Sequence, residues 1–247
     1  MLQIALIVFL YAIIIIFNNL KHDYLRLIWF SNIMTTCYLR RNQMRREQTR
    51  NLAITALFIA IFLLQTFVPN IGYIRILPGL PAITTAPLTV AVYSLLMGPV
   101  AGTCFGIFWG LLRVILAYTQ PGDMVSLILF QNIFISFIPS ICAGLFPGLI
   151  GKASQNKSRG VKEGSYIIAG AVTSLTNTVL VILLTSLIFM GNSSRLMGYM
   201  GNFATGTPLI QALIIALGMN GLIEAIFTAI VTPIIVTPLK TVMSRAR

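Results

Sequence analysis

Six long apolar runs follow one another along the chain, and its positively charged residues gather in alternate gaps between them. Hydrophobic residues make up 57% of the sequence and charged residues only 9%, a balance that soluble domains do not have. An α-helix needs roughly 20 apolar residues to cross a bilayer. The pattern therefore predicts an all-α integral membrane protein, a bundle of six transmembrane helices. We place these helices at about 51–68, 82–97, 100–118, 125–149, 164–190 and 207–237.

The distribution of Lys and Arg predicts how this bundle is oriented. Basic residues stand before the first run, between the fourth and fifth runs, and after the sixth, whereas the opposite gaps hold only Arg75 and Arg195. Loops rich in Lys and Arg stay on the cytoplasmic side of a membrane. We therefore expect the N- and C-termini of the bundle to be cytoplasmic. The net charge of +12 then reflects topology, and we expect no nucleic-acid partner.

Residues 1–43 precede this unit and form a segment of different character. An apolar run, Leu2–Phe17, is followed by a basic stretch. The segment could be signal-like, although no small-residue cleavage site follows its apolar core. It could also be a seventh helix, or translated upstream sequence with Met44 as the true start. We expect 1–43 to be a dispensable N-terminal extension and 44–247 to be the six-helix membrane domain.

The chain lacks the residues that most membrane enzymes need. It has five carboxylates and one His, and Glu224 is the only carboxylate well inside a predicted span. Metal sites require clustered Asp, Glu, Cys or His ligands. The fragment Gly151-Lys152-Ala153 fails as a phosphate-binding loop, because Ala153 stands where Ser or Thr is required. We therefore expect no metal, no cofactor and no catalytic residue, and any ATP hydrolysis must occur in a partner.

Polar side chains of four predicted helices fall at a similar depth in the outer half of the bilayer, roughly 7–20 Å below its surface at 1.5 Å per residue. The proposed substrate-binding residues among them are Arg113, Asn132, Thr176, Asn177, Asn220 and Glu224. A charge in hydrocarbon is costly, so these groups should face a protein interior or a cavity. Arg113 ringed by amides and hydroxyls suits a small anionic ligand. The alternative is that Arg113 pairs with Glu224 and the other groups join the helices.

Small residues recur at four-residue spacing on three of the predicted helices. The positions are Gly102, Gly106 and Gly110, then Gly144 and Gly148, and finally Ala56 and Ala60. Such stripes allow two helices to approach closely. We expect the glycine stripes to pack within the bundle. Ala56 and Ala60 lie on a helix with large apolar side chains all round, so we expect them to dock a partner in the membrane.

Several segments resemble a family of membrane transport proteins. They are Ala56–Ala60, Pro69–Ile74 with Pro78–Thr84, Leu96–Gly102 and Gly106–Leu111, in that order along the chain. Together they resemble the substrate-binding (S) components of energy-coupling factor (ECF) vitamin transporters, over about 44–240. Leu175–Thr178 and Asn220–Ala225 are most similar to the pantothenate branch of that family.

The resemblance implies a function and a set of partners. An S component of this branch captures a small anionic vitamin, pantothenate, at its outer face in the bacterial cytoplasmic membrane. It works with a transmembrane coupling subunit and two ATPase subunits, which supply the energy, and it is not an enzyme itself. Two alternatives are an S component for another vitamin or precursor, and a stand-alone secondary carrier.

Overall fold

The computed structural model describes residues 47–68, 72–74, 83–119, 124–190 and 208–245. The expected extension at 1–43 lies outside these residues, as do Arg75 and Arg195. The chain divides into two compact units, Met1–Ile54 and Thr55–Arg247. The second unit contains all of the residues proposed to bind substrate.

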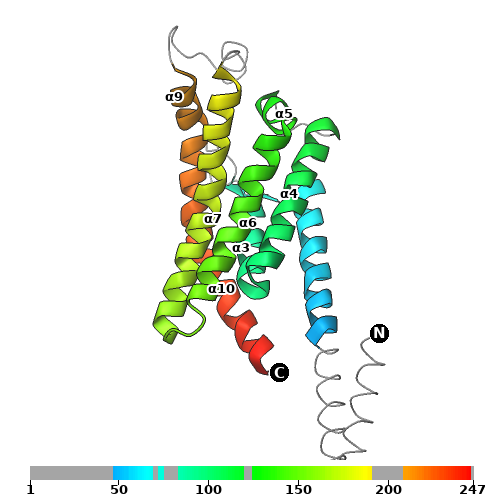
Figure 1. Ribbon diagram of the computed structural model, residues 1–247, viewed down its shortest axis with the longest axis vertical. Helices are drawn as coiled ribbons and strands as arrows, with labels where there is room; N and C mark the ends of the chain where they lie inside the picture. The colour runs from blue at the N-terminus through cyan, green and yellow to red at the C-terminus, as the bar shows by residue number, and fades with distance from the viewer. Residues whose placement is uncertain (1–46, 69–71, 75–82, 120–123, 191–207, 246–247) are drawn as a thin grey trace, which may run out of the picture. The chain divides into compact units, whose positions relative to one another are not determined.

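The described chain is helical, as predicted, apart from one very short pair of strands (Figure 1). The helices are Glu47–Phe67, α3 (Ala86–Met97), α4 (Pro99–Thr119), α5 (Met124–Phe130), α6 (Ile133–Ala153), α7 (Arg159–Ile188), α9 (Leu209–Leu213), the π-helical turn η2 (Ile214–Gly218) and α10 (Met219–Arg245). The strands β1 (Tyr73–Ile74) and β2 (Ile83–Thr84) pair antiparallel. Within the described ranges, five helices are long and apolar enough to cross a membrane: Glu47–Phe67, α4, α6, α7 and the continuous run Leu209–Arg245.

The second predicted span is shorter than expected. The apolar pattern predicts a helix at 82–97, but α3 has only 12 residues and begins at Ala86. The reason is Pro87 in its first turn, because a proline ring inside a helix clashes with the carbonyl four residues earlier. A helix of this length is about 18 Å long, against roughly 30 Å for a bilayer core. The predicted hairpin with α4 is present, and it turns at Gly98, whose φ of 91° favours glycine.

The fourth predicted span is interrupted, which the apolar pattern did not predict. That pattern predicts one helix at 125–149, whereas α5 ends at Phe130 and α6 begins at Ile133. Asn132 is the N-cap of α6, and its side-chain oxygen accepts a hydrogen bond from the Phe134 amide at 3.0 Å. Ser136 Oγ donates to the Phe130 carbonyl at 2.7 Å. Short polar side chains thus satisfy backbone groups that a continuous helix would have paired.

The glycine stripes pack helix against helix, as predicted. A Cβ added to Gly106 on α4 would press on the Ser140 carbonyl of α6, and one added to Gly144 would press on the backbone of Gly102. A Cβ added to Gly170 on α7 would press equally closely on the Thr228 carbonyl of α10. These contacts bring the backbones of α4, α6, α7 and α10 close enough for polar groups on different helices to meet.

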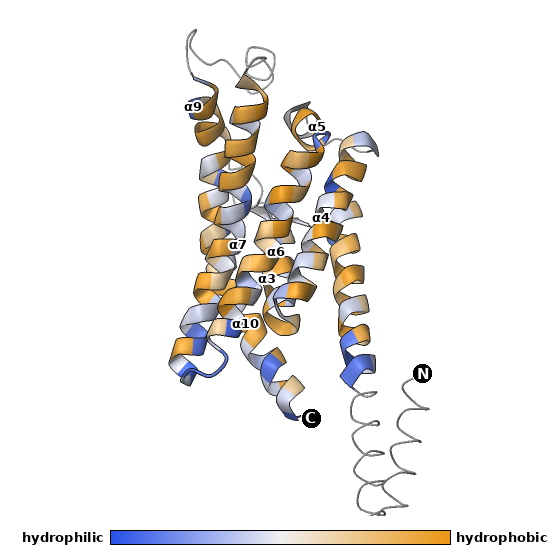
Figure 2. Ribbon diagram, in the orientation of Figure 1, coloured by the Kyte–Doolittle hydropathy of each residue, from blue (hydrophilic) through white to orange (hydrophobic). Residues whose placement is uncertain are grey.

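An aromatic cluster fills the space between the first helix, α3 and α4. The ring of Phe62 is 1% exposed and lies 5.2 Å from the ring of Phe105, measured between centroids. Tyr93 on α3 stacks on Phe105 at 4.5 Å. Large apolar side chains also remain exposed along the outer helix faces, such as Ile226 and Ile230 on α10. Figure 2 shows apolar residues along the helix middles, and hydrophilic ones at the α6–α7 turn and the end of α10.

Candidate functional site

Arg113 lies in the last two turns of α4, between two aromatic rings. Its guanidinium carbon is 4.2 Å from the centroid of Trp109, one turn earlier on α4, and 4.8 Å from that of Phe130 at the end of α5. The negative faces of these rings attract the cation and replace part of its lost hydration. The α5–α6 break therefore contributes to this environment, because it places Phe130 at the end of a separate helix.

Asn177 connects Arg113 to α7. Arg113 Nη1 donates a 2.9 Å hydrogen bond to Asn177 Oδ1, and Asn177 is only 7% exposed. The same nitrogen is 3.5 Å from Ser140 Oγ on α6, a long and therefore weak contact. The guanidinium group has five N–H donors in a fixed plane. Side chains from α4, α6 and α7 thus meet at one cationic centre.

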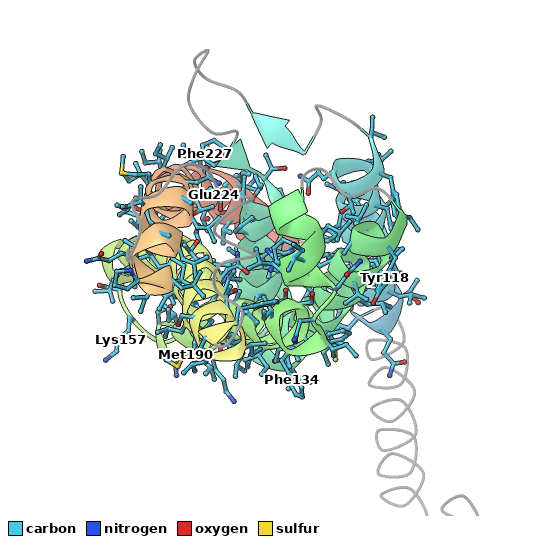
Figure 3. The ribbon with its side chains drawn as sticks, turned by 90° about the horizontal axis from the view of Figure 1, so that it is seen from above. Tyr118, Phe134, Lys157, Met190, Glu224 and Phe227 are labelled. Atoms are coloured by element: carbon cyan, nitrogen blue, oxygen red, sulfur yellow. The ribbon has the colours of Figure 1, made fainter. Side chains whose placement is uncertain are left out.

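Glu224 has a different set of partners. It lies on α10, is 4% exposed, and its Oε1 accepts hydrogen bonds from the Thr84 amide at 2.9 Å and the Thr84 hydroxyl at 2.7 Å. Asn220 Nδ2 lies 3.4 Å from the same oxygen. Figure 3 shows Glu224 beside the segment that carries the two strands. The hydrogen bonds of Glu224 thus connect α10 to β2, whereas those of Arg113 connect α4 to α7 and α6.

Asn220 follows an irregular turn in its helix. The π-helical turn η2 ends at Gly218, immediately before α10 begins at Met219. Such turns insert an extra residue per turn and occur frequently at functional sites. Within the described residues, Asn220 Oδ1 is a buried oxygen without a hydrogen-bond partner. It could therefore accept a hydrogen bond from a ligand.

The other two predicted residues take different positions. Asn132 caps α6 through its side-chain oxygen, so it shapes the helix start next to Phe130. Thr176 is half-buried on α7, one residue before the buried Asn177. Adjacent residues on a helix point about 100° apart, so these two face different directions. The structure brings Arg113 and Asn177 into direct contact, and Asn220 and Glu224 into a second contact.

Several residues that complete this region are not predicted by the sequence pattern. Ser140 could have been found, because Ser136 and Ser140 continue the four-residue spacing of Gly144 on the face of α6 that meets α4. Ser174 lies three residues before Asn177 and is therefore on the same helix face. Thr84 gave no such signal, because its partner Glu224 lies 140 residues away in the sequence. Among the described residues, no group of three or more His, Cys, Asp or Glu could hold a metal ion.

Comparison with known proteins identifies the family. The model of the family described as "ECF transporter, substrate-specific component" matches residues 50–236. The chain belongs to this family. It is therefore a membrane protein and a transporter component, not an enzyme, and the earlier resemblance is confirmed.

Two curated relatives give further information on this S component. A protein of Leuconostoc mesenteroides named pantothenate transporter PanT is 39% identical over 151 residues, which cover 59% of this chain and 72% of the relative. A protein of Lactococcus lactis named pantothenic acid transporter PanT is 29% identical over 190 residues, which cover 70% of this chain and 91% of the relative. The match to both extends over most of each relative.

Proposed function

We propose that this S component binds pantothenate within the membrane and delivers it for uptake. Both relatives are named as transporters of that vitamin. The observation that carries the proposal is Arg113, a cation inside an apolar bundle, placed between aromatic rings and bonded to Asn177. A fixed guanidinium with several N–H donors can bind a carboxylate while keeping its protein contacts.

The polar region also suits the remainder of the ligand. Pantothenate has a carboxylate, an amide and two hydroxyls. We assign its carboxylate to Arg113, and its amide and hydroxyl end to Asn177, Thr176 and Asn220. The Oδ1 atom of Asn220 is buried and has no described hydrogen-bond partner, so it can accept a bond from the ligand. Glu224 would repel the carboxylate, so it lines the hydroxyl end. Asn132 contributes by fixing the start of α6, because its side-chain oxygen is used as the helix cap.

We further propose six membrane crossings with both ends of the bundle in the cytoplasm. The basic residues at the α6–α7 turn and near the end of α10 lie toward one end of the helices (Figure 2). The short α3 is compatible with a crossing, because Pro87–Leu95 are all buried among other helices. Irregular backbone at membrane depth is tolerated where protein covers it. Residues 44–247 would be the functional domain and 1–43 dispensable.

Energy would come from partners, namely a transmembrane coupling subunit and two ATPase subunits. We propose that Ala56 and Ala60 dock the coupling subunit, since both are exposed on the helix Glu47–Phe67 while Phe58 and Phe62 are buried.

Ala60→Leu should keep ligand binding and reduce co-purification with the coupling subunit, because added bulk separates close-packed helices. Cys104→Leu adds bulk at an exposed position of α4 and is the control. Undiminished co-purification of Ala60→Leu would refute this docking site.

The role of Arg113 can be tested with two ligands that differ in one group. Losing a hydrogen bond to a charged group costs about 1.5–3 kcal/mol, which is roughly 10- to 150-fold in affinity. Arg113→Ala should therefore weaken pantothenate binding by that factor, and binding of its neutral alcohol analogue much less. Isothermal titration of the purified protein measures both. An equal loss for the two ligands would show that Arg113 joins the helices and does not bind the carboxylate.

A further inference from the structure

A lysine near the end of α10 lies over a tyrosine ring of α7, far from the polar region around Arg113. Lys240 Nζ is 4.6 Å from the centroid of the Tyr166 ring, a cation–π contact. Lys240 is half-buried and Tyr166 is only 6% exposed. At 1.5 Å per residue, Lys240 lies about 24 Å beyond Glu224 along α10. The contact is therefore separate from the residues proposed to bind pantothenate.

A second lysine lies on the same face of α7 as Tyr166. Lys162 precedes Tyr166 by one helical turn, and helical side chains lean toward the N-terminus of their helix. The Tyr166 ring, with Lys240 over it, therefore reaches back toward Lys162. Ser165 Oγ is 2.7 Å from the Lys162 carbonyl oxygen and 2.8 Å from Ser154 Oγ, so the first turn of α7 is fixed to the end of α6. We name the three side chains the Lys162–Tyr166–Lys240 site.

The two lysines of this site have no acidic partner among the residues that the structure describes. Glu163, next to Lys162 in the sequence, pairs instead with Arg159 at 3.1 Å. Like charges on neighbouring helices repel one another, and an anion placed between them offsets that repulsion. The site therefore has the charge to bind an anionic group from outside the chain.

The surroundings of the site fit a phospholipid better than a free anion. Ile167 follows Tyr166 and Leu239 precedes Lys240, and both remain exposed, so apolar surface borders the ammonium groups. Figure 2 shows this change from apolar helix middles to hydrophilic residues at the α6–α7 turn and the end of α10. Tyrosine rings and the long apolar stems of lysines commonly lie at the level of lipid headgroups. A phospholipid supplies both a phosphate and acyl chains, whereas an inorganic anion supplies no apolar part.

We propose that Lys162 and Lys240 bind the phosphate of one anionic phospholipid, while Tyr166 holds Lys240 in place and the acyl chains lie along α7 and α10. Basic pockets between transmembrane helices bind anionic headgroups in other membrane proteins. A zwitterionic lipid carries its own cationic group beside the phosphate, so it should bind more weakly. The bound lipid contacts two helices and should therefore stabilise the folded protein.

Native mass spectrometry of the purified full chain counts bound lipid directly. Phosphatidylglycerol should bind at one molecule per chain, and phosphatidylcholine with the same acyl chains should bind several-fold more weakly. Lys240→Gln and Lys162→Gln should each weaken phosphatidylglycerol binding about fivefold. Lys240→Arg keeps the charge and should retain binding. Lys157→Gln is the matched control and should change little, because Lys157 is exposed in the α6–α7 turn and points outward (Figure 3).

Thermal unfolding gives a second test that needs no variant. Phosphatidylglycerol should raise the unfolding temperature of the unmodified protein more than phosphatidylcholine does, because it binds the folded state more tightly. Equal shifts with the two lipids would mean that only acyl chains are recognised, and would overturn the site.

The remaining outcomes separate the lipid from other anions. Equal weakening by Lys157→Gln and Lys240→Gln would show diffuse attraction between charges and no defined site. Displacement of phosphatidylglycerol by an equal concentration of inorganic phosphate would show a site for free phosphate. Unchanged lipid binding in Lys162→Gln and Lys240→Gln would overturn the proposal, and reduced co-purification of these variants with the coupling subunit would then assign the lysines to an acidic protein surface. None of these measurements uses pantothenate, so they are independent of the proposed ligand.

Discussion

Arg113 shows how a charge is accommodated inside an apolar bundle. Its cation lies over the rings of Trp109 and Phe130 and donates to Asn177. These contacts come from three helices and offset part of the cost of removing the guanidinium from water. Removing an acceptor that serves this half-buried cation should therefore destabilise the fold, as well as weaken ligand binding at the proposed site.

The two bond lengths at Arg113 predict unequal effects of two substitutions. Asn177→Leu replaces the acceptor at 2.9 Å with an apolar side chain of similar size. We expect it to lower the free energy of unfolding by about 1 kcal/mol or more, because a half-buried charged donor loses its short hydrogen bond. Ser140→Ala removes a contact of 3.5 Å and should cost clearly less. Thermal unfolding in detergent compares the two, and equal destabilisation would contradict this description of the Arg113 contacts.

At the residue scale, the sequence predicts some of these contacts and not others. The shared depth of Arg113 and Asn177 followed from helix rise alone, and the structure places them in contact. The role of Glu224 could not be predicted in this way. Its partner Thr84 lies in a non-helical segment, where helix rise gives no position. A strand that reaches across to another helix has no periodic signal in the sequence.

At the scale of elements, the apolar runs predict where the helices lie, whereas prolines and capping side chains determine where they begin and end. The third span, predicted at 100–118, is α4 at Pro99–Thr119. The predicted helix bounds are wrong at two places. Pro87 makes α3 begin later than predicted, and Asn132 caps a new helix, α6, inside the predicted fourth span. The turn η2 was also not predicted, because a π-helical insertion does not change hydrophobicity. Hydropathy indicates whether a segment lies in the membrane or in water, whereas capping residues and prolines determine where a helix begins.

The close approach of α4 and α6 gives a prediction at this scale. A Cβ at Gly106 would press on the Ser140 backbone, which cannot yield as a flexible side chain can. Gly106→Ala should therefore destabilise the protein by about 1–3 kcal/mol, the usual cost of overpacking. Gly164→Ala on α7 is the control, because nothing lies within 4 Å of its added Cβ, and alanine should stabilise that helix slightly. Equal thermal stability of the two variants would mean that the α4–α6 contact is looser than described.

At the scale of the whole molecule, transport divides between this chain and its partners. The described residues hold a polar region in an apolar bundle and no cluster of metal ligands. The family is the substrate-specific component of ECF transporters, so this chain selects the cargo. The proposed coupling and ATPase subunits would supply the energy. Ligand selection should therefore be a property of this chain alone.

Titration of the purified chain with vitamins, in the absence of any partner, tests the central claim most directly. Pantothenate should bind saturably at one molecule per chain, and other water-soluble vitamins should not compete with it at equal concentration. The physical reason is that in the proposed site Arg113 would bind a carboxylate, while Asn177 and Asn220 would bind an amide and hydroxyls at fixed distances from it. Preferential binding of a different vitamin, with no binding of pantothenate, would contradict the account.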